Sequence, residues 1–471
     1  MTYREATECI NYIGKRGSVL GLGPITKLLK MLGDPQDKLK IIHVAGTNGK
    51  GSICTFLEMM YREEGKRVGR YISPTIHDYL ERFQINGEEM LKDTFARLFT
   101  KVYEAVNNMD EEEQPTAFEI ETAIAFLYFA LENVDIVILE VGMGGREDAT
   151  NVIKHPVCTV FANIGMDHMQ FLGDTIEKIA YQKAGIIKKG CPVVCYPSDE
   201  RVISVLREEY GKVNEKVLSA EKVLSETDRE YGSDGPVLNL NGRDENKEES
   251  VRKNFNVADA SELDVLSETL CGSTFIYKGE EYSISLAGTY QIYNAITAIR
   301  TKLLLDGSLK KEALTKVSWE GRFEKLSDKP LFIKDGAHNI QGAKALKESL
   351  QKHFTNAHFI FIIGVLRDKE YEKMMELLCP LAKSCYLLRP DNARGLETEI
   401  LAKVVSRYCD DVTCCKDVQD AVSKAACRWR EMTDADKSKN MEMKQDTVIV
   451  AWGSLSYIGE VDPKYCMQRL E

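Results

Sequence analysis

The chain has 471 residues and a formal net charge of −11, with 44% hydrophobic and 29% charged residues. This balance is typical of a globular protein of two or three domains, and the negative charge argues against a general nucleic-acid binder. No apolar stretch approaches the ~18 residues of a membrane span, and the N-terminus lacks a secretory signal pattern. The 13 cysteines are scattered and lack the paired spacing of a zinc site. We therefore predict a cytoplasmic protein with free thiols that binds neither nucleic acid nor membrane.

Helical spacing in the first forty residues is followed by a strand–turn–helix unit at residues 41–65. This unit begins with the apolar run IIHVA, breaks through the turn GTNGKGS and continues with helical spacing. Backbone N–H groups of such a turn converge on an anion, and the helix dipole adds to them. Lys50 occupies the position from which a P-loop lysine reaches the phosphates of a nucleotide.

The turn departs from the standard P-loop pattern G-x-x-x-x-G-K-[ST]. Its first glycine is Gly46 where the pattern would place one at Val44, and Lys50 is followed by Gly51 before Ser52. The alternative is a glycine-rich turn that binds nothing. Phosphate binding is favoured because glycine, asparagine and lysine coincide at one strand-to-helix junction.

The next segment contains a short strand, a loop entered by Ser73-Pro74, and two helical stretches around the acidic loop DEEEQPT, where Thr116 is a predicted N-cap. Two buried strands follow, and one ends in Glu140 while the other leads to His168. Ligands of parallel sheets lie beyond the carboxyl ends of the strands, so Lys50, Glu140 and His168 are expected near one crevice. A carboxylate, an imidazole and a hydroxyl can complete a magnesium shell with water and phosphate oxygens. The alternative is a charge at a strand end beside a helix-capping histidine.

Lys183 lies on a helix that Gly185 interrupts, and a lone helical lysine is usually solvated. Residues 214–270 are too polar to bury, which predicts a solvated, partly mobile insertion. A β-rich piece, STFIYKGEEYSISL, and a helix at residues 294–305 then close the first domain.

The last third is predicted to be a second α/β unit with a parallel Rossmann-like sheet and right-handed crossovers, because strands alternate with helices. It lacks GxGxxG, so dinucleotide binding is not expected. Asp335 and His338 follow its first strand, either as a base or nucleotide contact or as an Asx-turn with an exposed histidine. Arg322 could clamp a phosphate or pair with Glu320 or Glu324.

Several strings occur in one order: IHVAGTNGKGS, the Ser73-Pro74 loop with ERFQING, LEVGMGGREDATN, IGMDHMQFLGDT, QKAGII, WEGRFE, DGAHN and GSLSYIGE. Together they resemble the folylpolyglutamate synthase/dihydrofolate synthase family, within the Mur-ligase-like superfamily of ATP-dependent, amide-forming ligases. The resemblance implies an α/β fold in two domains. A P-loop-containing, ATPase-type domain with a mainly parallel sheet would span residues 1–306, and a Rossmann-like glutamate ligase domain would span residues 307–471.

The resemblance also implies roles for individual positions. ATP would be contacted by Asn48, Gly49, Lys50, Gly51, Asn294, Arg322 and Asp335. Magnesium ligands would be Ser73, Glu140 and His168, with a second ion on Lys183 in carbamate form. The residues closest to the chemistry would be Lys50, Lys183 and His338. The pterin pocket would be lined by Thr116, Phe118, Asp148 and Ala149.

The implied reaction, on a monomer, adds L-glutamate to a tetrahydrofolate, to dihydropteroate or to both, with ATP and two Mg²⁺ ions. The loop reads Ser73-Pro74-Thr75 where the family usually has SPH, and His77 follows two residues later. This departure concerns the pterin-binding side of the site and retains Ser73. A muramyl-peptide ligase would need a UDP-binding domain before Gly46, where no room is expected. A P-loop GTPase or kinase would need an NKxD or lid pattern, which is absent. The remaining alternative, a non-catalytic ATP-binding regulator, is disfavoured because the lysines and metal ligands are all present.

Overall fold

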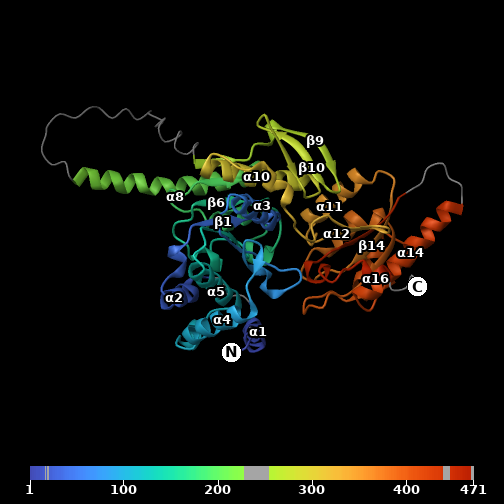
Figure 1. The fold of residues 1–471 in the computed structure, drawn as a ribbon, viewed down its shortest axis with the longest axis horizontal. Coiled ribbons are helices and arrows are strands. Elements are labelled where there is room, and N and C mark those ends of the chain that lie inside the picture. Colours follow the sequence, from blue (N-terminus) through green and yellow to red (C-terminus); the bar gives the residue numbers. More distant parts are fainter. Residues whose placement is uncertain (16, 18–20, 228–253, 439–445, 468–471) are drawn as a thin grey trace. The chain divides into compact units, whose positions relative to one another are not determined.

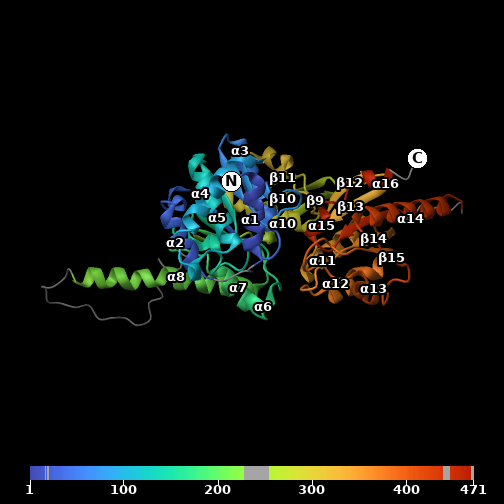
Figure 2. The ribbon, with the colours of Figure 1, turned by 90° about the horizontal axis from the view of Figure 1, so that it is seen from below.

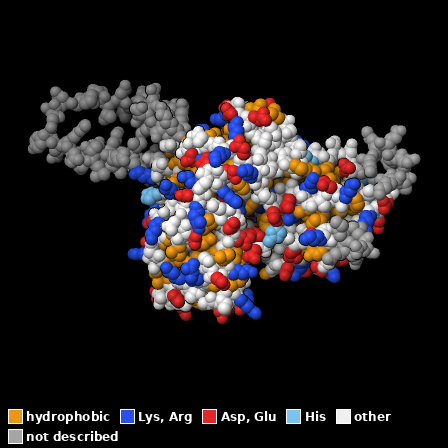
Figure 3. All heavy atoms as spheres, viewed as in Figure 1, with side chains coloured by type: hydrophobic (Ala, Val, Ile, Leu, Met, Phe, Trp, Pro, Cys, Tyr) orange, Lys and Arg blue, Asp and Glu red, His pale blue; other side chains and the backbone are white. Residues whose placement is uncertain are grey.

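The structure is a computed structural model that describes residues 1–15, 17, 21–227, 254–438 and 446–467. The chain divides into two compact units (Figure 1), and each collects several stretches of sequence. Unit 1 comprises Met1–Ser73, Arg82–Ala260 and Ile296–Lys310, and unit 2 comprises Pro74–Glu81, Ser261–Ala295 and Lys311–Glu471. In the described part of the chain, no helix is long and apolar enough to cross a membrane. Acidic and basic side chains are interspersed over the face shown in Figure 3.

Unit 1 is built on an eight-stranded sheet in the order β4-β3-β2-β5-β1-β6-β7-β8. Its strands are β1 (Ile41–Ala45), β2 (Val68–Tyr71), β3 (Phe83–Ile85), β4 (Glu88–Glu89), β5 (Ile136–Glu140), β6 (Cys158–Phe161), β7 (Val193–Cys195) and β8 (Phe255–Val257). The strands from β2 to β8 in this order pair in parallel, and β3 and β4 extend one edge antiparallel. Every residue of β1 and β5 is buried, as continuous apolar runs predict for a sheet covered on both faces.

The helices of unit 1 are α1 (Tyr3–Gly14), α2 (Gly23–Met31), α3 (Lys50–Glu63), α4 (Lys92–Val106), α5 (Ala117–Leu131), α6 (Met169–Leu172), α7 (Ile176–Ala184) and α8 (Glu200–Thr227). Helix α3 packs against β1, β2 and β5, whereas α1, α2, α4 and α5 pack on one another, below β1 and β6 in Figure 1. Thr116 caps α5 in a reciprocal capping box with Glu119, which confirms the predicted N-cap. Helix α10 (Thr289–Asp306) contributes residues to both units.

The predicted polar insertion at residues 214–270 contains regular secondary structure at both ends. Helix α8 continues to Thr227, and the chain is again in strands at β8 and β9 (Leu263–Thr269). Residues 228–253 lie outside the described residues. The prediction failed for β9 because a strand can stay solvent-exposed while its backbone pairs with a neighbour, and most of β9 is exposed.

Unit 2 contains a three-stranded antiparallel sheet, β11-β10-β9, and a six-stranded sheet, β12-β13-β17-β14-β15-β16. The further strands are β10 (Gly272–Tyr277), β11 (Glu280–Ile284), β12 (Glu324–Asp328), β13 (Leu331–Asp335), β14 (His358–Ile363), β15 (Ala382–Leu387), β16 (Val412–Cys414) and β17 (Thr447–Trp452). The six-stranded sheet is parallel, as predicted, except that β12 pairs antiparallel with β13. A short turn joins these two strands, and a connection that short permits only antiparallel pairing.

Helices cover both faces of the six-stranded sheet. They are α11 (Ile340–His353), α12 (Tyr371–Leu378), α13 (Thr398–Val405), α14 (Val418–Ser438), α15 (Leu455–Ile458) and α16 (Lys464–Met467). Figure 2 shows α14 on one side of β14 and α12 and α13 on the other. Strand β17 divides its side chains accordingly: Val448 and Val450 enter one apolar core, and Ile449 and Ala451 enter the other. The sequence prediction of an α/β fold with a mainly parallel sheet and a second α/β unit is therefore confirmed.

Candidate active site

The glycine-rich turn connects the end of β1 to the first residue of α3. Gly46 has φ +150°, and a Cβ atom there would lie 2.6 Å from the Cβ of Ala162. Gly49, the N-cap of α3, has φ +91°. Glycine is therefore required at both positions. Because α3 begins at Lys50, the N–H groups of its first turn have no acceptor within the helix and are available to an anion.

The middle of the turn is tied to the strand beside it. The N–H groups of Thr47 and Asn48 donate to the carbonyl oxygen of Asn163, at 2.8 and 3.1 Å. The backbone N–H of Asn48 is therefore already engaged. The N–H groups of Lys50 and Gly51, in the first turn of α3, have no acceptor within the helix.

Lys50 and Glu140 lie close together, as expected from their strands. The Nζ of Lys50 is 3.7 Å from the Oε1 of Glu140 and 3.4 Å from the carbonyl oxygen of Thr47. The two side chains are only 14% and 6% exposed. A cation and a carboxylate thus stand at the N-terminus of α3 with little competing water.

Lys183 is buried on α7, so the alternative of a solvated helical lysine is wrong. Its Nζ donates to the carbonyl oxygen of Gly46 at 2.8 Å. Burial, with the nearby charge of Lys50, lowers the pKa of Lys183 to about 7, while Asp167 and Asp148 oppose that shift. The amine therefore exists partly in its neutral, nucleophilic form near neutral pH.

His168 begins α6 in a left-handed conformation, with φ 50°. Its N–H donates to the Oδ1 of Asp167 at 2.8 Å, and its Nε2 lies 4.0 Å from the same oxygen. Asp167 thus accepts from the backbone of His168, and the sequence reasoning assigned it no role although it stands in the same MDH string. The alternative of a helix-capping histidine is confirmed for the position of His168, which is the N-cap residue of α6. Its side chain makes no cap hydrogen bond.

The donor groups fit a magnesium ion that shares its shell with a nucleotide better than one held by protein alone. Within the described ranges, no three His, Cys, Asp or Glu side chains come together as a metal site. Glu140 and His168 would have to be completed by oxygens from Ser73, water and phosphate. Magnesium is usually bound in this way, by one or two carboxylates together with substrate phosphates.

Two of the four expected pterin residues, Phe118 and Asp148, lie against one glycine. A Cβ atom on Gly142 would lie 2.5 Å from the Cζ of Phe118 and 3.2 Å from the Oδ2 of Asp148, and the buried Ala149 follows directly. Thr116, the fourth, uses its side chain in the capping box of α5, where its Oγ1 donates to Glu119 at 2.8 Å. Its structural role is thus evident.

Asp335 in unit 2 is a buried acceptor for several donors. Its Oδ1 accepts the N–H of Ala337 at 2.8 Å, which is the predicted Asx-turn, and its Oδ2 accepts the N–H of Phe323 at 2.8 Å. The hydroxyl of Tyr290 also donates to Oδ2, at 3.3 Å. Burial raises the pKa of Asp335, and the Arg322 guanidinium opposes that rise.

The other nucleotide candidates of unit 2 lie around the same turn. Arg322 donates to the carbonyl oxygen of Gly321 at 3.2 Å. The two acidic partners suggested for Arg322 both form ion pairs with Lys334. The Nζ of Lys334 lies 3.8 Å from Glu320 and 3.4 Å from Glu324. The Nδ1 of His338 is 2.8 Å from the carbonyl oxygen of Gly336.

Asn294 is buried on α10 and donates to the Oε1 of Gln291 at 3.0 Å. Tyr290 stands four residues before it, so both belong to one face of the helix. This spacing was the signal by which the sequence could have revealed Tyr290.

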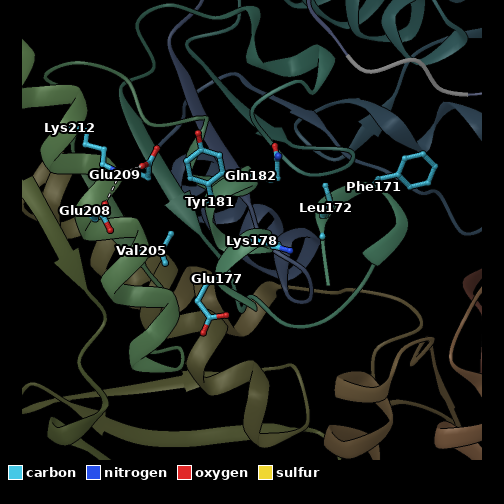
Figure 4. Close-up of a pocket in the computed structure, with 11 residues that line it drawn as sticks. Phe171, Leu172, Glu177, Lys178, Tyr181, Gln182, Val205, Glu208, Glu209 and Lys212 are labelled. Carbon is cyan, nitrogen blue, oxygen red and sulfur yellow. Dashed lines mark hydrogen bonds and ion pairs between the residues drawn. The ribbon is translucent and has the colours of Figure 1, made fainter. Parts of the chain in front are cut away.

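A pocket of about 520 Å³ lies on the outer side of α7, between α6 and α8 (Figure 4). Its charged side chains already have partners of opposite charge. Lys212 contacts Glu208 at 2.6 Å and Glu209 at 2.9 Å, and Arg146 reaches Glu209 at 2.9 Å. We assign no ligand to this pocket.

Comparison with known proteins agrees with this fold. The family model of the Mur ligase middle domain matches residues 44–301, and that of the Mur ligase glutamate ligase domain matches residues 321–435. These two matches define a Mur-type ligase.

Individual relatives narrow this class. The chain is 33% identical to the dihydrofolate synthase/folylpolyglutamate synthase of Bacillus subtilis, over 98% of each chain. It is 30% identical to the folylpolyglutamate synthase of Lacticaseibacillus casei, over 84% of this chain and 87% of that protein. The crystal structure of the Mycobacterium tuberculosis folylpolyglutamate synthase, complexed with ADP and AMPPCP, superimposes with a TM-score of 0.79 at 27% identity, covering 98% and 99% of the two chains. The chain belongs to the folylpolyglutamate synthase/dihydrofolate synthase family.

Proposed function

We propose that this protein is an ATP-dependent ligase that joins L-glutamate to a folate through an amide bond. The observation that carries the proposal is the glycine-rich turn at residues 46–49 between β1 and α3, which we call the phosphate turn. Beside it the Nζ of Lys50 lies 3.7 Å from the Oε1 of Glu140, and Lys183 is hydrogen-bonded to Gly46. The matched family models and relatives support the same activity. In this proposal residues 1–306 bind ATP and residues 307–471 form the glutamate ligase domain.

The reaction requires an activated carboxylate, because a carboxylate and an amine do not condense in neutral water. ATP transfers its γ-phosphoryl group to a carboxylate of the pterin substrate, which yields ADP and an acyl phosphate. The α-amino group of L-glutamate attacks the acyl carbon, and the tetrahedral intermediate expels phosphate as the amide forms. The amine loses its proton in this step.

Residues of this chain would stabilise the charge that develops during transfer. The N–H groups at the start of α3 and the ammonium group of Lys50 would contact the triphosphate. Such preorganised donors and cations lower the barrier most when water is excluded, and both Lys50 and Glu140 are largely buried.

Magnesium, when bound, would neutralise phosphate charge, and we assign its ligands to Ser73, Glu140 and His168. Lys183 would hold a second ion after its amine has been converted to a carbamate. Its lowered pKa, about 7, supports this role because only the neutral amine adds to carbon dioxide.

The remaining roles follow the family resemblance. We assign Asn294, Arg322 and Asp335 to the nucleotide and His338 to the region of the transferred phosphate. The pterin would contact Thr116, Phe118, Asp148 and Ala149. We further expect a monomer that works in the cytoplasm.

Release of ADP by the purified protein tests the proposed function. ADP should appear only when both L-glutamate and a pterin substrate are present, and comparing dihydropteroate with tetrahydrofolate identifies the preferred acceptor. ADP release that needs neither substrate would instead indicate a plain ATPase.

A further inference from the structure

His43 is a buried residue of β1, the strand that leads into the phosphate turn and that we call the phosphate strand. It has no role in the reaction described above. It lies on β1, three residues before Gly46, and its side chain is 0% exposed. Burial lowers the pKa of His43 to about 3, so the imidazole is neutral at physiological pH. A polar ring in the centre of a sheet needs a partner, because burying an unpaired polar group costs free energy.

The partner is the hydroxyl group of Thr150, which connects His43 to Asp148. The Nε2 of His43 lies 2.8 Å from the Oγ1 of Thr150. That Oγ1 donates to the Oδ1 of Asp148 at 2.6 Å, and the Oδ2 of Asp148 accepts the N–H of Met143 at 2.8 Å. A continuous chain of hydrogen bonds thus runs from β1 to residues 142–145, which we call the glycine loop and which lie beside Phe118.

The direction of each hydrogen bond follows from the chemistry of the groups. The Oδ1 of Asp148 accepts both the N–H and the single hydroxyl proton of Thr150. The same hydroxyl then accepts from His43, whose proton must be on Nε2. The Nδ1 of His43 is buried and lacks a hydrogen-bond partner among the described residues. The reverse direction would place a proton on Nδ1 and leave a buried N–H unpaired, which is costly.

A capping role for Asp148 explains only part of this arrangement. Asp148 is the N-cap of the short helix η4 (Ala149–Val152), and its Oδ1 accepts the N–H of Thr150 at 3.0 Å. That cap needs neither the hydroxyl group of Thr150 nor the imidazole of His43. Both are present, fully buried and aligned with one oxygen of Asp148.

We propose that His43 and Thr150 are positioning residues that hold the carboxylate of Asp148, as an acceptor of fixed orientation, for the pterin substrate. The inference rests on the proposed function, since the pterin contact of Asp148 belongs to it. Thr150 occupies one carboxylate oxygen and the glycine loop occupies the other, so the side chain cannot rotate without breaking hydrogen bonds. The phosphate strand thereby supports the pterin side of the active site.

Kinetics of conservative variants test the proposal. Thr150→Val removes the hydroxyl group but keeps the size and the backbone N–H, and it should raise the KM for the pterin substrate about tenfold while the KM for ATP changes less than about twofold. Thr150→Ser and His43→Gln retain the hydroxyl and an N–H donor, respectively, and should stay close to the unsubstituted enzyme.

Thr159→Val is the matched control. Thr159 is equally buried, it pairs with His43 across β1 and β6, and its Oγ1 donates to Ile186 at 3.4 Å instead of to Asp148. This variant should leave the KM for the pterin substrate unchanged. An equal effect of Thr150→Val and Thr159→Val, or no effect of Thr150→Val, would overturn the proposal.

Nitrogen NMR of the ¹⁵N-histidine-labelled full chain tests the hydrogen-bond direction without any activity. His43 should appear as a neutral ring protonated on Nε2, unchanged between about pH 5 and 9, and Thr150→Val should alter its signal. A proton on Nδ1 would overturn the proposal even if Thr150→Val failed to fold. If the unsubstituted enzyme releases no ADP with any pterin, the proposed function fails; if it turns over and Thr150→Val is normal, only this inference fails.

Discussion

The buried amine of Lys183 donates a hydrogen bond to the backbone carbonyl oxygen of Gly46, 2.8 Å away. This contact ties helix α7 to the phosphate turn, although 137 positions separate the two residues in the chain. A second contact brings the glycine loop to the same place, because a Cβ atom on Gly145 would lie 2.7 Å from the carbonyl oxygen of Lys183. Three segments of unit 1 therefore meet at one lysine.

Lys183→Met should stabilise the protein while abolishing turnover. The pKa of Lys183 is about 7 in the fold against 10.5 for the ordinary side chain, so near neutral pH folding discharges part of the amine and desolvates the charge of the rest. Allowing for the lost hydrogen bond to Gly46, methionine should gain about 1–3 kcal/mol in the free energy of unfolding near pH 7. Urea unfolding without added bicarbonate measures the difference.

The pH dependence of that difference has a definite sign. Between pH 7 and 10.5 the unfolded chain binds more protons at Lys183 than the folded chain, so the unsubstituted protein becomes more stable relative to the variant as the pH rises. The gain in the free energy of unfolding from Lys183→Met should have its full size below about pH 7 and should vanish near pH 10.5. A variant that is less stable at every pH would contradict the burial of a neutral amine.

Lys50→Ala should reduce turnover at least about 10²-fold, because it removes the cation nearest to the transferred phosphoryl group. Steady-state ADP release at saturating substrates measures this loss. Lys66→Ala is the control, since Lys66 is exposed just beyond the same helix and should be dispensable. Near-normal turnover of Lys50→Ala would remove the phosphate turn from the mechanism.

Gly46→Ala should weaken nucleotide binding and lower the melting temperature. The new Cβ would stand 2.6 Å from the Cβ of Ala162 on a backbone with φ +150°, and such overpacking typically costs about 1–3 kcal/mol. Calorimetry with a non-hydrolysable ATP analogue should show at least about tenfold weaker binding. Gly23→Ala, where a Cβ meets nothing within 4 Å, should behave as the unsubstituted protein.

Tyr290→Phe should raise the KM for ATP about three- to tenfold and leave the KM for the pterin unchanged. The substitution removes the hydroxyl that donates to Asp335 at 3.3 Å, while the two backbone donors remain. Tyr181→Phe, an exposed tyrosine of the outer pocket, is the matched control. Equal KM values for ATP in both variants would show that Tyr290 does not act through Asp335.

Much of the fold could be predicted because most residues of the buried parallel strands are apolar and polar residues or glycines follow the strands. The run IIHVA and the strand that ends in Glu140 are examples, and both are fully buried. Strand β9 could not be predicted in this way, because its stability comes from backbone pairing rather than from buried side chains. The division into two compact units could not be predicted from the sequence either, because each unit combines distant stretches of the chain.

Local spacing indicated which residues stand at the ends of strands, but not what surrounds them. The burial of Lys183 depends on contacts with Gly46 and the glycine loop, and no helical pattern around it predicts them. The chain from His43 to Asp148 similarly joins residues more than a hundred positions apart. Family resemblance identified the lysine, whereas only the three-dimensional structure identified the histidine.

Transfer of a labelled oxygen tests the central claim most directly. A pterin substrate carrying ¹⁸O in both oxygens of its reacting carboxylate is incubated with ATP, L-glutamate and the enzyme, and the released phosphate is analysed by mass spectrometry. Formation of an acyl phosphate predicts one ¹⁸O atom in each phosphate, because the carboxylate oxygen leaves with the phosphoryl group when the amide forms. Amide formation with unlabelled phosphate, or hydrolysis of ATP without amide, would contradict the account.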